Sequence, residues 1–149
     1  MTDLAYTAGM GLLLDQGWSA LDARVLLLDA AGTYAPAISD PFLSSLDLAA
    51  NELGTLSACP GYERKTISSR DVVTDQLENE AEAHGANISW TSLGSVGPTA
   101  RAAVVYFHIT DDTDSVPLLY FDSIFPRTLN GQDLTLQWSL EGLFITAFT

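Results

Sequence analysis

The chain has few residues of the kinds that carry out catalysis at neutral pH. Its two histidines are His84, in an acidic stretch, and His108, in an apolar run. A Ser-His-Asp catalytic triad needs three side chains that converge in space. The sequence lacks the Gly-x-Ser-x-Gly turn that presents the nucleophilic serine in many hydrolases. We therefore predict no catalytic residues and no enzyme activity. The alternative, a small hydrolase on a sandwich scaffold, requires a deep cleft in which His108 meets carboxylates.

The single cysteine, Cys59, is followed by Pro60 and Gly61, which predict a turn. One cysteine excludes a disulfide within the chain. Because no base is visible as its partner, we interpret Cys59 as a small buried hydrophobic residue rather than a nucleophile.

Three closely spaced aspartates, Asp111, Asp112 and Asp114, carry the oxygen ligands that calcium prefers. The stretch is too short for an EF-hand and lacks its glycine and terminal glutamate. The sequence also has no His/Cys cluster suited to zinc and no glycine-rich phosphate loop. We predict a solvated hairpin turn here, and neither a metal nor a cofactor.

The charge balance limits the partners of this protein. The chain has 19 acidic and 6 basic residues, a net charge of −13. Binding to nucleic acid or to an anionic membrane depends on Lys and Arg, so both are excluded as partners. The acidity is typical of a soluble surface, or else of an acidic face that meets a basic partner.

Three of the basic residues, Arg64, Lys65 and Arg70, lie close together. We predict that they pair with Glu63 and Asp71 across the strands of a hairpin. The alternative is that they contact an acidic surface on another subunit.

The elements that position these residues are short and mostly extended. Short apolar or alternating runs separated by turns predict a mainly β fold: an antiparallel, jelly-roll-like β-sandwich of about eight strands in a single domain, residues 1–149. Ala23–Ala30, Ala102–Ile109 and Val116–Ile124 are the most apolar strands, and the acidic turn separates the last two. A helix is the competing interpretation of Ala23–Ala30, and Gly32 and Pro36, which cut the run short, favour the strand.

Several less apolar segments complete the predicted sheet. Asn130-Gly131 is a strong hairpin-turn signal. Glu78–His84 is expected to be a solvated turn or loop because of its charge. The remaining strands are expected at Gly61–Ser68 with Val72–Leu77 as its hairpin return, at Ala86–Leu93 with Ile88 and Trp90 on one face, at Asp133–Ser139 and at Leu143–Phe148.

One short helix is predicted at Thr7–Gln16, with Thr7 as its N-cap and Gly17 in the left-handed region after its end. Gly9 and Gly11 each cost about 1 kcal/mol relative to alanine, so this helix needs tertiary packing. Ala31–Leu56 is expected to be a compact connection with short helical pieces.

That connection contains Ser39-Asp40-Pro41, which predicts a helical turn that begins at Pro41 and runs through Leu46.

In the buried strand Ala102–Ile109, the adjacent side chains of Tyr106 and Phe107 must face opposite sides of the sheet. The second face therefore needs a cover, either from the upstream helical segment or from another subunit.

Met1–Tyr6 has no periodicity and is expected to be an N-terminal arm. It has no basic region typical of a signal peptide, and no apolar run in the chain is long enough for a membrane span. We expect a protein that stays in the cytoplasm, or leaves it by assembly or lysis.

The order of segments resembles a family of small virion proteins of tailed bacteriophages. The segments are ARVLLLDAAGTYAP, GYERKTI, ISWTSLG, ARAAVVYFHITDDTDSVPLLYFDS and LTLQWSLEGLFIT. In that family, segments similar to VALVSSSYTP, GYARKTL, GAVVYKDTGSDATSPLLAYID and TIQWDANGILKL occur in this order. The resemblance runs from Met10 to Phe148, and the chain departs from the pattern at Leu43–Leu56 and in its acidity.

The resemblance implies a structural protein in the virion, assembled in the host cytoplasm. We expect a homotrimer that decorates the capsid exterior and binds the major capsid protein. The alternative is a tail or head-fibre component that contacts host glycan. A strand-adding arm needs little structure when free, so shell or subunit contact is assigned to Met1, Thr2, Asp3, Leu4, Ala5 and Tyr6.

Overall fold

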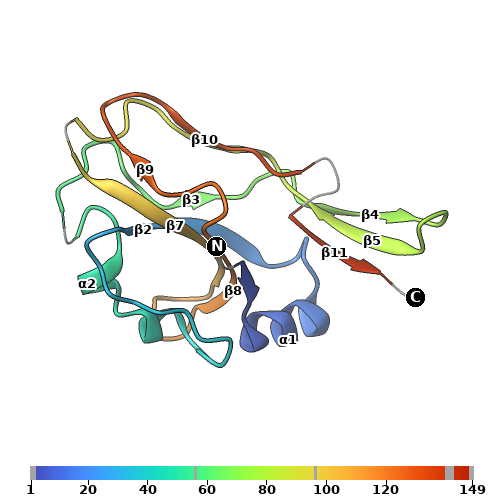
Figure 1. Cartoon of the computed structure of the whole chain (residues 1–149). Coiled ribbons are helices and arrows are strands. Elements are labelled where there is room, and N and C mark those ends of the chain that lie inside the picture. Colours follow the sequence, from blue (N-terminus) through green and yellow to red (C-terminus); the bar gives the residue numbers. More distant parts are fainter. Residues whose placement is uncertain (1–2, 56, 96, 140–142, 148–149) are drawn as a thin grey trace.

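A computed structural model describes residues 3–55, 57–95, 97–139 and 143–147 (Figure 1). Its largest element is a six-stranded antiparallel sheet. The strands follow one another in the order β1 (Leu4–Ala5), β8 (Val116–Phe121), β7 (Thr99–His108), β2 (Asp22–Asp29) and β3 (Lys65–Thr66), and β9 (Arg127–Thr128) also pairs with β7.

The centre of this sheet is the pair β2–β7, which is apolar on both faces. Val25 lies opposite Val105, and Leu26 lies opposite Val104. All four side chains are fully buried. The expected burial of both faces is therefore confirmed. Since successive side chains of a strand point to opposite faces, the molecule has a core on each side of the sheet.

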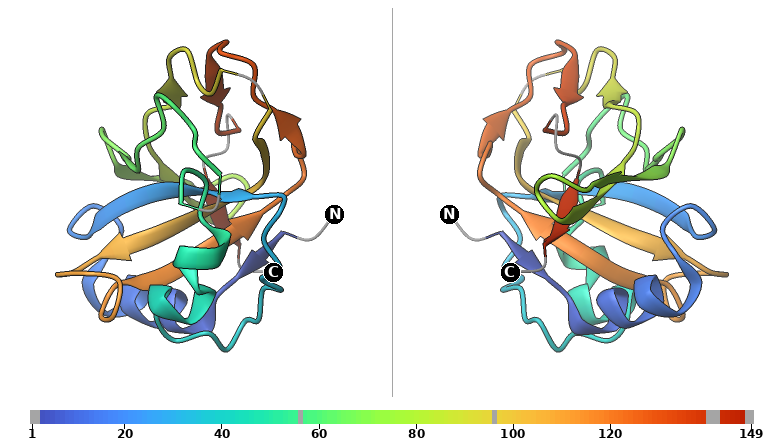
Figure 2. Two further views of the ribbon diagram at one scale, coloured as in Figure 1. Left: turned by 90° about the vertical axis from the view of Figure 1, so that its left-hand side faces the viewer. Right: turned by 90° about the vertical axis from the view of Figure 1, so that its right-hand side faces the viewer.

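The first core lies between the sheet and a second layer, the pair β6 (Ile88–Trp90) and β10 (Leu134–Leu136). Ile88 and Trp90 are buried on one face of β6, as the sequence predicts. Leu136 reaches the same core from β10, and Trp18 reaches it from the turn after α1. Figure 2 shows these layers from two sides.

The second core is covered by the upstream connection. A short 3₁₀ helix, η1 (Leu43–Leu46), and the helix α2 (Leu48–Asn51) lie beneath the sheet (Figure 2). Their leucines pack in this core together with Tyr6. The cover required by Tyr106 thus comes from this chain, and the second face gives no argument for a partner subunit. The helical turn expected from Pro41 begins two residues later, at Leu43, and Phe42 precedes it in an extended conformation.

Helix α1 (Thr7–Gln16) has the predicted bounds. The expected cap is wrong, because Tyr6 is the N-cap residue and no side chain caps this end. Gly17 has φ 89° and ψ 149°, and its N–H donates to Leu13 O at 2.9 Å. Gly9 is buried, and a Cβ there would lie 2.3 Å from the carbonyl oxygen of Pro117. Close packing of the helix on β8 explains this glycine.

A three-stranded sheet, ordered β11 (Phe144–Ala147), β5 (Glu80–His84) and β4 (Asp71–Asp75), projects to one side (Figure 1). Two predictions are wrong here. Glu80–His84 is a strand rather than a loop, and it is the partner of β4 in place of Gly61–Ser68. The pattern Glu-Ala-Glu-Ala-His alternates as a half-buried strand does, and its charges concealed that period.

The mainly β, antiparallel fold with one short helix near the N-terminus is confirmed. The strands outnumber the prediction because several have two or three residues. Asn130-Gly131 does not close a hairpin: Gly131 has φ 83°, but β9 pairs with β7 whereas β10 pairs with β6. The turn carries the chain from one sheet to the other. The end of the last expected strand, Phe148, lies outside the described residues.

Candidate functional site

The two histidines are not brought together by the fold. His84 Nε2 lies 2.6 Å from Oε2 of Glu82 on the same strand. His108 Nδ1 lies 3.4 Å from Ser115 Oγ, which also accepts the N–H of Ile109 at 3.1 Å. Ser115 is fully buried, so its hydroxyl is not accessible to a substrate. The contact closes the turn between β7 and β8.

The acidic stretch is the polar turn that the sequence predicts. Asp114 Oδ1 accepts the N–H groups of Thr110 and Asp111, both at 2.9 Å, and these bonds lower the pKa of Asp114. Asp111 Oδ1 accepts the N–H of Thr113 at 2.7 Å. Within the described ranges, no three His, Cys, Asp or Glu residues are grouped to hold a metal ion.

Arg64 joins this turn to the rest of the domain. Its Nη1 donates to Asp112 Oδ1 at 2.6 Å, and its Nε donates to Glu52 Oε1 at 2.7 Å. The Tyr62 hydroxyl donates to the same Glu52 oxygen at 2.9 Å, and the guanidinium lies 5.7 Å from the centre of the Tyr106 ring. Glu52 and Asp112 raise the pKa of Arg64, and Arg64 lowers the pKa of Asp112. These contacts occupy the guanidinium of Arg64 and stabilise the fold.

The expected pairing of the basic cluster is therefore wrong in most of its detail. Lys65 contacts Glu63 at 2.7 Å, but the two residues belong to the same segment. Arg70 lies over the ring of Trp18, with its guanidinium carbon 5.8 Å from the ring centre. Cys59 is buried, which raises the pKa of its thiol, in agreement with its interpretation as a small hydrophobic residue.

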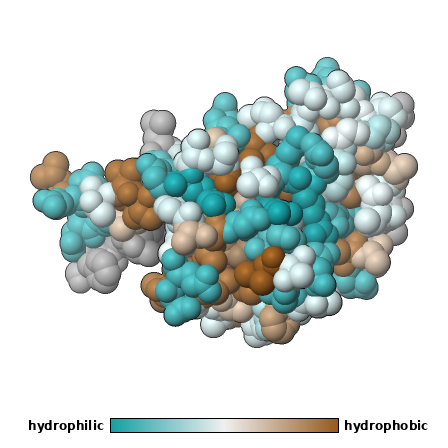
Figure 3. Space-filling view, turned by 180° about the vertical axis from the view of Figure 1, so that it is seen from behind, coloured by the Kyte–Doolittle hydropathy of each residue, from teal (hydrophilic) through white to brown (hydrophobic). Residues whose placement is uncertain are grey.

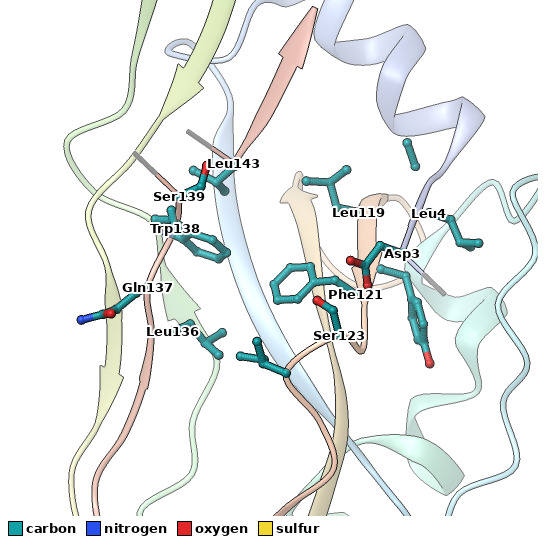
Figure 4. Close-up of a pocket in the computed structure, with 13 residues that line it drawn as sticks. Asp3, Leu4, Leu119, Phe121, Ser123, Leu136, Gln137, Trp138, Ser139 and Leu143 are labelled. Atoms are coloured by element: carbon teal, nitrogen blue, oxygen red, sulfur yellow. The ribbon is translucent and has the colours of Figure 1, made fainter. Parts of the chain in front are cut away.

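A groove of about 460 Å³ lies between the β1–β8 edge of the large sheet and β10 (Figure 4). Phe121 and Trp138 form its aromatic wall, with ring centres 5.8 Å apart and ring planes at 83°. The polar residues that line it are Asp3, Tyr120, Ser123, Gln137 and Ser139, and the side chain of Gln137 points away from the groove (Figure 4). An aromatic wall beside hydroxyl and carboxylate groups suits a small polar ligand.

The projecting sheet is the second surface of interest. Val72 and Val73 of β4 are 51% and 42% exposed, and Leu77 at the hairpin tip is 95% exposed. A hollow of about 200 Å³ lies between this sheet and α1, lined by Leu13, Leu14, Gly17, Trp18, Val72, Ala81, Glu82 and Ala83. Figure 3 shows the projecting sheet from behind, at the left, with hydrophobic and hydrophilic surface side by side.

The residues expected to contact a shell are held by this chain's own domain. Leu4 and Ala5 form β1 and pair with β8, and Asp3 Oδ1 accepts the N–H of Asp122 at 3.0 Å. Tyr6 is fully buried, so it is a core residue and is not available for contact. Contact through Asp3, Leu4 and Ala5 stays a prediction, and Met1 and Thr2 lie outside the described residues.

Sequence reasoning missed the hairpin of β4 and β5 as a surface. The usable signal was Asp-Val-Val-Thr-Asp, two adjacent valines between aspartates. Neighbouring residues of a strand face opposite sides of the sheet, so at least one of two adjacent valines is exposed when only one face of the sheet is covered.

None of the described helices is long and apolar enough to cross a membrane. Comparison of the chain with family models, with curated proteins and with solved structures gives no match.

Proposed function

We propose that this protein is a bacteriophage virion structural protein that oligomerises and attaches to the capsid exterior as a decoration or cement protein. The observation that carries the proposal is the projecting sheet, whose edge strand exposes Val72 and Val73 and whose tip exposes Leu77. Exposed apolar surface with polar surroundings is typical of protein contact sites. The order of sequence segments supports the choice of a virion.

The proposed partners are the major capsid protein and further copies of this chain, as a homotrimer at the threefold positions of the shell. We assign the capsid contact to the projecting sheet, because η1 and α2 already cover the second face of the large sheet. The role of the protein is to bury shell surface across subunit boundaries and so to stabilise the particle against internal pressure.

The test is the copy number of this protein in purified virions, measured by quantitative mass spectrometry against the major shell protein. A ratio near one, or a simple fraction that fits threefold sites, supports decoration. A copy number of only a few per particle indicates a location in the neck, tail or fibre instead. Its absence from the particles contradicts every virion role.

A second candidate function is contact with host glycan, favoured by the groove between β8 and β10. Ser123 is exposed and lies beside Phe121, whose ring meets that of Trp138 (Figure 4), as expected for a sugar subsite. Ser123→Ala should weaken binding to purified host-cell polysaccharide, whereas Ser45→Ala, also exposed and outside the groove, should not. Equal binding by the two variants contradicts a glycan site in this groove.

A further inference from the structure

Among the described residues, no strand pairs with the outer edge of β4, so this edge is open to a further strand. β4 is the last strand of its sheet, and each of its residues is exposed or half-buried. Alternate residues of an edge strand direct their N–H and C=O groups away from the neighbouring strand, toward solvent. Natural edge strands are commonly protected by Lys, Pro or a bulge. β4 has neither residue, and its register with β5 is regular from Asp71 to Asp75.

The charges around this edge select the partner. The hairpin, residues 71–82, contains no Lys or Arg, and its carboxylates are those of Asp71, Asp75, Glu78, Glu80 and Glu82. Glu82 is occupied by His84 at 2.6 Å. Asp71 and Asp75 lie at the two ends of β4, four positions apart and therefore on the same face as Val73.

A second copy of this chain is a poor occupant of the edge. Antiparallel pairing of two β4 strands about Val73 places Asp71 of each copy opposite Asp75 of the other. Like charges directly opposite each other destabilise a strand pair, and both chains carry a net charge of −13. Complementarity of charge thus favours a basic segment from a different protein.

The apolar side chains of β4 define the rest of the recognition pattern. Val72 shares a face with Ala83, its partner on β5, and this face lines the hollow beside Leu14 of α1. Leu14 is 82% exposed, so the outer side of the hollow is open. A large apolar side chain of an added strand, opposite Val72, would lie next to Leu14 and cover it.

We propose that β4 accepts an extended basic segment as an added antiparallel strand. The segment carries Lys or Arg opposite Asp71 and Asp75, hence at its first and fifth positions, a β-branched residue between them opposite Val73, and a large apolar residue opposite Val72. Backbone hydrogen bonds supply the attachment, and the charges and the hollow supply the choice of segment. The inference rests on the proposed attachment role and names the chemistry of the partner.

The experiment measures binding of short labelled peptides to the full chain by fluorescence anisotropy. The probe is Lys-Thr-Val-Leu-Lys between Gly-Ser flanks. Its antiparallel alignment places Leu opposite Val72 and the two lysines opposite Asp71 and Asp75. A second peptide has Glu in place of both Lys residues, and a third keeps the sequence but carries N-methyl groups that prevent backbone pairing. We expect the Lys peptide to bind at least tenfold more tightly than either of the others.

A matched pair of protein variants tests the position of the site. Asp71→Asn/Asp75→Asn should weaken binding of the Lys peptide at least fivefold. The side-chain oxygen of asparagine at position 75 can still accept the N–H groups of Leu77 and Glu78, so the hairpin turn is kept. Glu63→Gln/Asp133→Asn changes the net charge by the same amount, away from β4, and should change binding less than twofold. Circular dichroism verifies that all variants are folded.

The possible results distinguish failure of the strand-addition proposal from failure of the proposed virion role. Equal binding of the Lys and Glu peptides, or equal effects of the two double variants, overturns the inference even if the protein is abundant in virions. Undiminished binding of the N-methylated peptide overturns strand addition. Strand binding by a protein that is absent from virions would retain the inference and contradict the virion role alone.

Discussion

Arg64 and Asp112 lie 48 positions apart in the sequence, yet two hydrogen bonds of 2.6 and 2.9 Å join their side chains. Arg64 also holds Glu52, whose side chain is only 8% exposed. One guanidinium thus connects the acidic turn, the start of β3 and the end of α2. The chain has only 6 Lys and Arg residues, and Arg64 is one that stabilises the fold through these contacts.

Removal of Arg64 should destabilise the protein far more than removal of its neighbour. Arg64→Met leaves the nearly buried Glu52 carboxylate without its cation, which costs about 2–4 kcal/mol. Lys65→Met breaks a pair with the exposed Glu63, which solvent screens, and should change the free energy of unfolding little. Urea unfolding of both variants measures the difference, and equal losses would contradict the structural role of Arg64.

The Arg64–Asp112 pair should make the stability fall in acid. Hydrogen bonds from Arg64 hold the pKa of Asp112 below its ordinary value of 3.8 in the folded protein. A lowered folded pKa means that the contribution is complete above the unfolded pKa and is lost as the pH falls through the folded pKa. The free-energy difference between wild type and Asp112→Asn should therefore be largest near pH 7 and shrink below about pH 4.

The control for this pH dependence is the same comparison in an Arg64→Met background, by urea unfolding from pH 2 to pH 7. Without the guanidinium, the effect of Asp112→Asn should become small and nearly independent of pH. An unchanged pH profile in that background would show that another group depresses the pKa of Asp112.

Replacing two glycines of α1 by alanine should change the free energy of unfolding in opposite directions. A Cβ at Gly9 would lie 2.3 Å from Pro117 O and 2.6 Å from Leu118 Cα, so Gly9→Ala should destabilise by about 1–3 kcal/mol through overpacking. A Cβ at Gly11 meets no atom within 4 Å, so Gly11→Ala should stabilise by up to about 1 kcal/mol. Thermal unfolding of the pair checks the docking of α1 on β8. Loss of stability in both would contradict it.

Tyr6 should behave as a core residue rather than as part of a free arm. Its hydroxyl lies 2.7 Å from that of Tyr34, which donates to Asp40 at 2.6 Å, and burial raises the pKa of Tyr6 to about 12. Tyr6→Ala should cost about 3–5 kcal/mol, whereas Tyr6→Phe should cost about 1 kcal/mol. Chemical unfolding measures both losses. A loss of less than about 1 kcal/mol for Tyr6→Ala would contradict the placement of Tyr6 in the core.

This result also changes how a shell contact by the N-terminal residues must be tested. Deletion of residues 1–6 removes a core side chain and so confounds binding with stability. Deletion of residues 1–2 keeps β1 and Tyr6. Unchanged binding of the shorter deletion to particles would contradict a contact by Met1 and Thr2.

The hairpin tip should affect attachment without affecting stability. Leu77 is 95% exposed, so Leu77→Lys should change the free energy of unfolding by less than about 0.5 kcal/mol. It adds positive charge to the surface proposed to meet a basic partner and should lower the number of copies bound per particle. Ile38→Lys, at a position 58% exposed and outside the hairpin, is the control. Equal occupancy of particles by the two variants would contradict attachment through the tip.

The sequence by itself determined the mainly β class, the helix bounds and the two central strands. Thr7–Gln16, the run from Ala102 and the alternating Ile88 and Trp90 carry strong local signals: periodicity, glycine at an end, and apolar residues on a known face. Such signals depend on neighbours within a few positions. They can therefore be read without knowledge of the rest of the chain.

Only the tertiary structure decided which strands pair and which surfaces remain open. The partner of β4 is β5, Arg64 reaches Asp112 rather than Asp71, and Tyr6 enters the core beneath the sheet. In each case the partners are chosen by shape and charge when distant segments meet, and the local pattern is equally compatible with another partner. The exposed edge of β4 is likewise a property of the whole sheet, since a strand becomes an edge only when no other strand covers it.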